Sequence, residues 1–122
     1  MKTSLLFSVL FVLLILALMP AQSLAGSYSY SGNDLAAAMP EWDKMYGKDT
    51  RADLVKAFYF GAYILGVADA TESQYSIPTA AKQGEIIAVV SKYLKNHRGQ
   101  WNDPAASLVI KALGEAFPKK SK

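Results

Sequence analysis

Residues 86–94, IIAVVSKYL, are the stretch that decides the fold. Their apolar side chains recur at the i, i+3, i+4, i+7, i+8 spacing of one helix face. That face consists of Ile86, Val89, Val90, Tyr93 and Leu94. The charged residues Glu85, Lys92 and Lys95 fall on the other side. The pattern predicts an amphipathic helix that buries one face and leaves the other in water.

The residues that follow predict a second helix paired with the first. We expect Gly99 to end the first helix in a left-handed conformation, and Asp103 with Pro104 to cap and begin the next. The second helix repeats the apolar spacing, through Leu108, Val109, Ala112, Leu113 and Ala116. Phe117 closes this stripe and Pro118 ends the helix. The two helices are expected to form a hairpin.

On the N-terminal side, a long helix is predicted from about Arg51 to Thr71, capped by Asp49 and Thr50. Its main apolar stripe is expected to be Leu54, Phe58, Gly61, Leu65 and Ala68. The small residues around Gly66 predict close approach of another helix, which would offset the cost of about 1 kcal/mol of a helical glycine. Asp69 is interpreted as a structural carboxylate that ties the following loop.

The remaining segments predict shorter features. Asn33 is expected to cap a first helical region. Pro40 is expected either to divide this region into two short helices or to kink a single helix. Residues 72–78 are expected to form a polar loop that ends at Pro78, and Thr79 is expected to cap the next helix.

Together these patterns predict an all-α fold, a small single-domain bundle of about four main helices with a C-terminal helical hairpin. The domain is expected to span residues 33–118. Residues 26–32, rich in Gly and Ser, predict a flexible leader, and residues 119–122 a basic tail.

The first 25 residues are typical of a secretory signal peptide. Lys2 precedes a nearly unbroken apolar run, and Pro20 and the triplet Ser23-Leu24-Ala25 follow it. We expect cleavage after Ala25 and a mature protein in the periplasm with no membrane contact. The alternative is an uncleaved anchor, although the run is shorter than the roughly 20 residues that a spanning helix needs.

Composition argues against several functions. The net charge of +3 falls to +2 once Lys2 is removed, and the basic residues form no stripe that would bind nucleic acid. The chain has one His and no Cys, so it lacks the ligands of a usual zinc site and the residues for Cys-His catalysis. We therefore expect no catalytic residues, no metal and no cofactor.

The strongest candidates for partner contact lie in the turn after the first hairpin helix. They are His97, Arg98, Gln100 and Trp101, with Gln74 and Tyr75 of the 72–78 loop in support. His97 is also explained as a residue that caps the helix C-terminus. Trp101 either folds back over the core or projects as an interface anchor.

A spaced set of residues resembles the Rap/Tai family of periplasmic immunity proteins, which protect bacteria from type VI secretion effectors. The resemblance covers about residues 57–118 and includes Gly66–Ala70, Ile77-Pro78, Asn96-His97, Pro104–Ala106 and Ala116–Pro118. It implies a non-catalytic protein whose partner is a cognate effector, a peptidoglycan amidase. It also implies a structural role for the motif Gly66–Ala70, which contains Gly66 and Asp69. Structural roles are likewise expected for Pro78, Pro104, Phe117 and Pro118, which lie at the ends of the loop and the helices. In the family a Pro usually follows the His, where this chain has Arg98.

The resemblance also marks a difference. Family members typically have one Cys beside the loop proline and another after the terminal Phe-Pro, whereas this chain has Ser76 and Lys119 there. Both partners of a disulfide are thus missing together, and a changed partner is one explanation.

Two other functions stay open at this point: a small helical periplasmic chaperone or stress protein, and a subunit of an envelope assembly. A homodimer is compatible with each of them.

Overall fold

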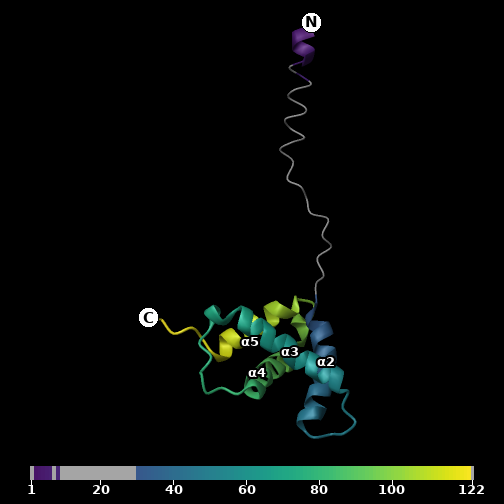
Figure 1. Cartoon of the computed structure of the whole chain (residues 1–122), viewed down its shortest axis with the longest axis vertical. Helices are drawn as coiled ribbons and strands as arrows, with labels where there is room; N and C mark the ends of the chain where they lie inside the picture. The colour runs from purple at the N-terminus through teal and green to yellow at the C-terminus, as the bar shows by residue number, and fades with distance from the viewer. Residues whose placement is uncertain (1, 7, 9–29, 122) are drawn as a thin grey trace.

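The computed structural model describes residues 2–6, 8 and 30–121. The domain consists of α2 (Gly32–Tyr46), α3 (Leu54–Ala70), α4 (Gln83–Asn96) and α5 (Ala105–Ala116), with the short 3-10 helices η1 (Glu72–Gln74) and η2 (Arg98–Gln100). Its described residues form no named strand, only an isolated bridge between Ser31 and Pro104. The predicted all-α bundle is confirmed (Figure 1). Residues 1, 7 and 9–25 of the proposed signal peptide lie outside the described residues.

The core is built from apolar side chains of all four helices. The largest fully buried ones are Phe60, Leu35, Ile64, Ile87, Leu94, Leu108, Leu113, Val90 and Val109. Leu94 of α4 and Leu113 of α5 were both expected in the seam of the hairpin, and both are completely buried. None of the described helices has the length and apolarity required to cross a membrane.

The ends of α4 and α5 differ from the sequence predictions. Lys82, not Thr79, precedes the first turn of α4, where the Glu85 carboxylate accepts the Lys82 backbone N–H at 3.0 Å. Gly99 has no positive φ, because α4 already ends at Asn96 and Gly99 lies in η2. Pro104 is the cap residue of α5 in place of Asp103, so α5 begins at Ala105, one position later than expected.

The first helix, α2, is capped by Ser31, two residues before the predicted cap Asn33. The Ser31 hydroxyl accepts the Asp34 backbone N–H at 3.2 Å, and the Asp34 carboxylate accepts the Ser31 backbone N–H at 2.9 Å. This reciprocal capping box fixes the start of α2, so Asn33 was wrong as the cap. The helix continues through Pro40, and the predicted division into two helices does not occur.

The long helix α3 begins at Leu54, after Asp53 rather than Asp49 or Thr50, and it is rotated relative to the predicted stripe. It buries Ala57, Phe60, Gly61, Ile64 and Ala68, whereas Leu54 and Phe58 are exposed. The prediction failed because α3 is apolar around most of its circumference, and periodicity cannot then select one face.

The close approach expected at Gly66 occurs at Gly61 instead. A Cβ at Gly61 would lie 2.8 Å from Cζ3 of Trp42 in α2, whereas one at Gly66 would meet nothing within 4 Å. Gly61 therefore allows α2 to approach α3, and the expected role of Gly66 was wrong.

Candidate functional site

The turn between α4 and α5 is held against the core by Trp101. Its indole Nε1–H donates a hydrogen bond to the main-chain oxygen of Leu94 at 2.9 Å, and the ring is half-buried. The Leu94 oxygen belongs to the last turn of α4, where carbonyls lack the usual i+4 partner, and it also accepts the His97 backbone N–H at 3.2 Å. Trp101 thus satisfies a helix-end acceptor and covers this end of the hairpin.

His97 also lies against α4. Its Nδ1 is 2.8 Å from the main-chain oxygen of Tyr93, and its ring stacks on Tyr93 with 3.9 Å between centroids. The Tyr93 hydroxyl donates to Oε1 of Gln100 at 3.2 Å, and burial together with the nearby Glu115 carboxylate raises the pKa of this phenol. His97 and Gln100 therefore brace the turn from within.

Arg98 is the exposed member of the turn. Its guanidinium carbon lies 5.8 Å from the Trp101 ring centroid, within the range of a cation–π contact. The structure therefore brings His97, Arg98, Gln100 and Trp101 together, with Arg98 on the outside of a braced turn.

The segment expected to be a flexible leader contributes to this site. The Gly32 backbone N–H donates to the Asp103 oxygen at 2.9 Å, and that of Asn33 to the Trp101 oxygen at 2.8 Å. A Cβ at Gly32 would lie 2.8 Å from the Trp101 oxygen, so glycine permits the contact. Of the predicted leader, residues 26–29 lie outside the described part of the chain, and residues 30–32 belong to the domain.

The 72–78 loop behaves differently from the prediction. Tyr75 is only 5% exposed, and its hydroxyl contacts Oγ1 of Thr71 and the main-chain oxygen of Ala68, so its interpretation as a surface contact was wrong. Asp69 is exposed, and its carboxylate accepts no hydrogen bond within the described residues. Thr71 and Tyr75 tie this loop to α3, as Asp69 was expected to do. Gln74 is exposed.

The two predicted contact loops do not form one surface. The 72–78 loop meets the chain just beyond α5, where Ser76 N–H donates to the Phe117 oxygen at 3.0 Å and the Ser76 hydroxyl accepts Lys120 N–H at 3.2 Å. The Trp101 turn precedes α5 (Figure 1). The 12 residues of α5 separate the two loops by roughly 18 Å.

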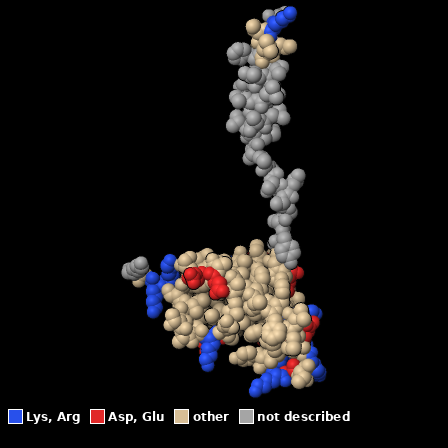
Figure 2. Space-filling view, viewed as in Figure 1, with Lys and Arg blue, Asp and Glu red and all other residues tan. Residues whose placement is uncertain are grey.

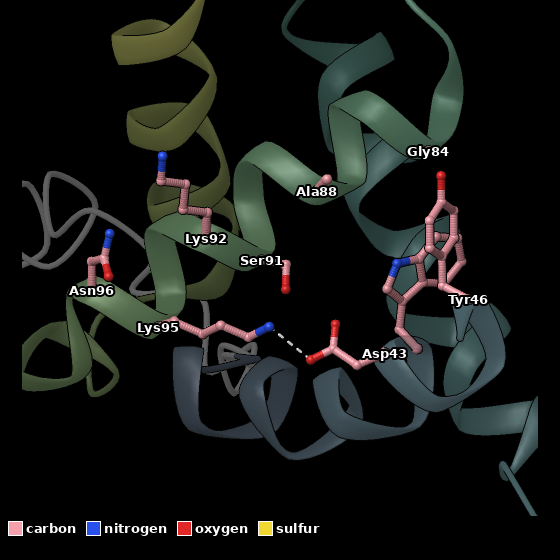
Figure 3. A pocket seen from close by; sticks show the side chains of 9 residues that line it. Asp43, Tyr46, Gly84, Ala88, Ser91, Lys92, Lys95 and Asn96 are labelled. Carbon is pink, nitrogen blue, oxygen red and sulfur yellow. Dashed lines mark hydrogen bonds and ion pairs between the residues drawn. The ribbon is translucent and has the colours of Figure 1, made fainter. Parts of the chain in front are cut away.

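A cleft that sequence reasoning missed runs between α2 and α4 (Figure 3). It has a volume of about 370 Å³, and the Lys95 ammonium pairs with the Asp43 carboxylate at 2.7 Å across it. The Ser91 hydroxyl is buried and has no hydrogen-bond partner in the described part of the chain. At the far end, Trp42 stacks on Tyr46 with 6.2 Å between centroids.

A second hollow of about 320 Å³ lies between α4 and α5 and includes Tyr93, His97 and Glu115. Lys92 and Asn96 line both hollows, so this part of α4 forms a ridge that leads into the Trp101 turn. Neither hollow could be found from sequence, because each depends on how two helices are spaced.

The charged groups are dispersed over the domain. In the view of Figure 2, Lys and Arg side chains gather in separate groups at its edges. Three surface carboxyls have a lowered pKa because each accepts a hydrogen bond. The donors are Ser31 for Asp34, Lys44 for Glu41 and Arg51 for Asp49. No group of three or more His, Asp or Glu side chains that could hold a metal occurs within the described residues.

A helical domain with a braced polar turn beside two open hollows is suited to contact with another protein. The sequence model of the family described as Rap1a immunity proteins matches residues 31–118. The chain therefore belongs to the Rap1a immunity protein family, which confirms the resemblance to the Rap/Tai proteins. The match starts at Ser31, the residue that caps α2, and includes α2 to α5. No curated protein matches the chain.

Proposed function

We propose that this protein is a non-catalytic immunity protein that binds a type VI secretion effector in the periplasm and occludes its active site. The observation that carries the proposal is the match to the Rap1a immunity family over residues 31–118, which includes every helix of the domain. The periplasmic location is supported by the signal peptide pattern of residues 1–25. The choice of a peptidoglycan amidase as the effector rests on the family resemblance.

The effector-binding surface that we propose is the Trp101 turn together with the α4 ridge. Arg98 is the residue best suited to anchor it, because it is exposed and lies on a turn that Trp101 and His97 hold in place. A preformed turn loses little entropy on binding. Lys92 adds a positive charge to the adjoining ridge, whereas the charge of Lys95 is balanced by Asp43. The charges of Lys92 and Arg98 favour an acidic group on the effector.

Replacement of Arg98 tests this surface. Arg98→Ala is expected to weaken effector binding by about 2 kcal/mol, the level of an interface hot spot, without a change in folding. Arg51→Ala is the matched control, since Arg51 is also exposed and lies in the loop between α2 and α3. Equal affinity of both variants and the unchanged protein would place the contact elsewhere.

One observation favours the chaperone alternative. Val55 and Phe58 are 80% and 61% exposed, and exposed apolar surface is what a chaperone uses to hold unfolded clients. Suppression of the aggregation of unrelated unfolded proteins, without binding to an effector, would support that alternative over immunity.

A further inference from the structure

The cleft between α2 and α4 is open because α4 presents only small side chains along part of it. Gly84, Ala88 and Ser91 line the cleft and follow one another at i, i+4 and i+7, so they lie on one face of the helix. A Cβ at Gly84 would already lie 3.3 Å from the Tyr46 ring of α2. The volume left between the helices is about 370 Å³, within the range of about 300–1,000 Å³ that is usual for small-molecule sites.

Ser91 is the residue of the cleft that packing does not explain. It is only 4% exposed, and its hydroxyl has no hydrogen-bond partner in the described part of the chain. A serine within a helix can bond to the carbonyl four residues earlier, but Ser91 does not do so. Figure 3 shows the hydroxyl pointing toward the ion pair of Lys95 and Asp43. A buried hydroxyl without a partner costs free energy, which a ligand group that reaches Ser91 would recover.

The charges beside Ser91 are balanced. The Lys95 ammonium pairs with one oxygen of the Asp43 carboxylate at 2.7 Å, and Figure 3 shows the Lys92 side chain directed away from this pair. An ammonium has three donors and a carboxylate has two acceptor oxygens, so the pair can still donate and accept. Balanced charge favours a neutral ligand over an ion. Neighbouring donors and acceptors suit hydroxyl groups, because each hydroxyl both donates and accepts.

The other end of the cleft is aromatic. Trp42 and Tyr46 stack with 6.2 Å between centroids and 27° between ring planes, and Tyr46 is 70% exposed. The Trp42 indole N–H makes no hydrogen bond within the described residues. The face of an aromatic ring is electron-rich and attracts the partly positive C–H groups of a ring that lies on it. The aromatic end therefore suits the flat, C–H-bearing side of a saturated ring.

We propose that the cleft between α2 and α4 binds a neutral carbohydrate of one or two pyranose rings. The C–H side of one ring lies on Tyr46, and hydroxyl groups bond to Ser91 and to the ion pair beside it. Sugars are the class of small molecule that combines an apolar ring face with several hydroxyls and no net charge. This site goes beyond the proposed immunity function and does not depend on the identity of any effector. Cell-wall glycan and free sugars both offer this chemistry, and the test separates them.

Titration of the mature protein with two disaccharides, followed by NMR of its backbone amides, tests the site. The probes are the disaccharide of N-acetylglucosamine, which represents cell-wall glycan, and maltose, which has no acetamido group. At least one should bind saturably and shift the amide signals of Tyr46 and Ser91. Stronger binding of the acetylated sugar would indicate glycan as the source, and stronger binding of maltose a free sugar. Failure of both to bind would overturn the proposal.

Two variants locate the bound sugar. Ser91→Ala breaks no hydrogen bond of the free protein, so helicity should be unchanged while the Kd rises roughly three- to tenfold, as expected for the loss of one hydrogen bond to the ligand. Ser107→Ala is the matched control, since it makes the same change on α5 outside the cleft, and its Kd should not change.

A second variant keeps the test decisive if Ser91→Ala fails to fold. Ala88 is exposed and lines the cleft, so Ala88→Phe should be tolerated by the fold and should fill the space of the sugar. Binding should then be lost. An unchanged Kd in both Ser91→Ala and Ala88→Phe would show that the sugar binds elsewhere and would overturn the proposal.

Discussion

The indole N–H of Trp101 and the main-chain oxygen of Leu94 are joined by a hydrogen bond of 2.9 Å. Leu94 is fully buried in the last turn of α4, so this bond connects the core directly to the turn that carries Arg98. The turn is consequently an extension of the folded core.

Loss of this bond should destabilise the domain. Trp101→Phe removes one of the two donors to the Leu94 oxygen and leaves the His97 backbone N–H at 3.2 Å, so we expect the free energy of unfolding to fall by about 1 kcal/mol. Trp101→Ala also removes the packing of the ring and should cost about 3 kcal/mol. Urea denaturation followed by circular dichroism measures both changes. Equal stability of Trp101→Phe and the unchanged protein would mean that the bond contributes nothing.

The buried leucines of the hairpin should be more sensitive than an exposed leucine. Leu94→Ala and Leu113→Ala are each expected to lower the free energy of unfolding by about 2–5 kcal/mol, because both side chains are completely buried. Leu54→Ala serves as the control, since Leu54 is 53% exposed and its truncation should cost much less. Thermal melts of the three variants provide the comparison, and a similar loss in all three would contradict the assignment of the core.

Two helical glycines should respond in opposite directions to the same change. Gly61→Ala forces a Cβ to within 2.8 Å of the Trp42 ring and 3.2 Å of Cδ1 of Ile87, and should destabilise by about 1–3 kcal/mol. A Cβ at Gly114 meets nothing within 4 Å, so Gly114→Ala should stabilise by roughly 0.5–1 kcal/mol through helix propensity. Stabilisation by both substitutions would show that α2 packs less closely on α3 than described.

The positions of the missing cysteines should still accept a disulfide. The Ser76 hydroxyl accepts the Lys120 backbone N–H at 3.2 Å, which brings residue 76 beside residue 119. The double substitution Ser76→Cys and Lys119→Cys should therefore oxidise spontaneously in the periplasm and raise stability by about 2–4 kcal/mol. Melting with and without reductant isolates the effect of the bond. Persistent free thiols after export would show that the two positions are too far apart.

The sequence was most informative where polar and apolar residues segregate clearly. In α4 and α5 the apolar stripes predicted the hairpin, including the buried Leu94 and Leu113. In α3 the same reasoning selected the wrong face, since apolar residues surround the helix and its rotation is set by tertiary contacts such as that of Gly61 with Trp42.

Candidate contact residues were predicted less well than helices. Tyr75 is a residue type common in interfaces, but its hydroxyl finds partners at Thr71 and Ala68, and its ring can therefore be buried. The cleft between α2 and α4 arises from residues far apart in the chain, such as Asp43 and Lys95, and no local pattern indicates it.

The central claim is that this member of the Rap1a immunity family neutralises a cell-wall amidase. The most direct test is a titration of the mature protein against candidate peptidoglycan amidase effectors of type VI secretion, with cleavage of purified peptidoglycan as the measured activity. We predict that cleavage ceases at equimolar amounts, and that Arg98→Ala shifts the titration to higher concentration while Arg51→Ala does not. Undiminished cleavage in the presence of excess folded protein would contradict the claim.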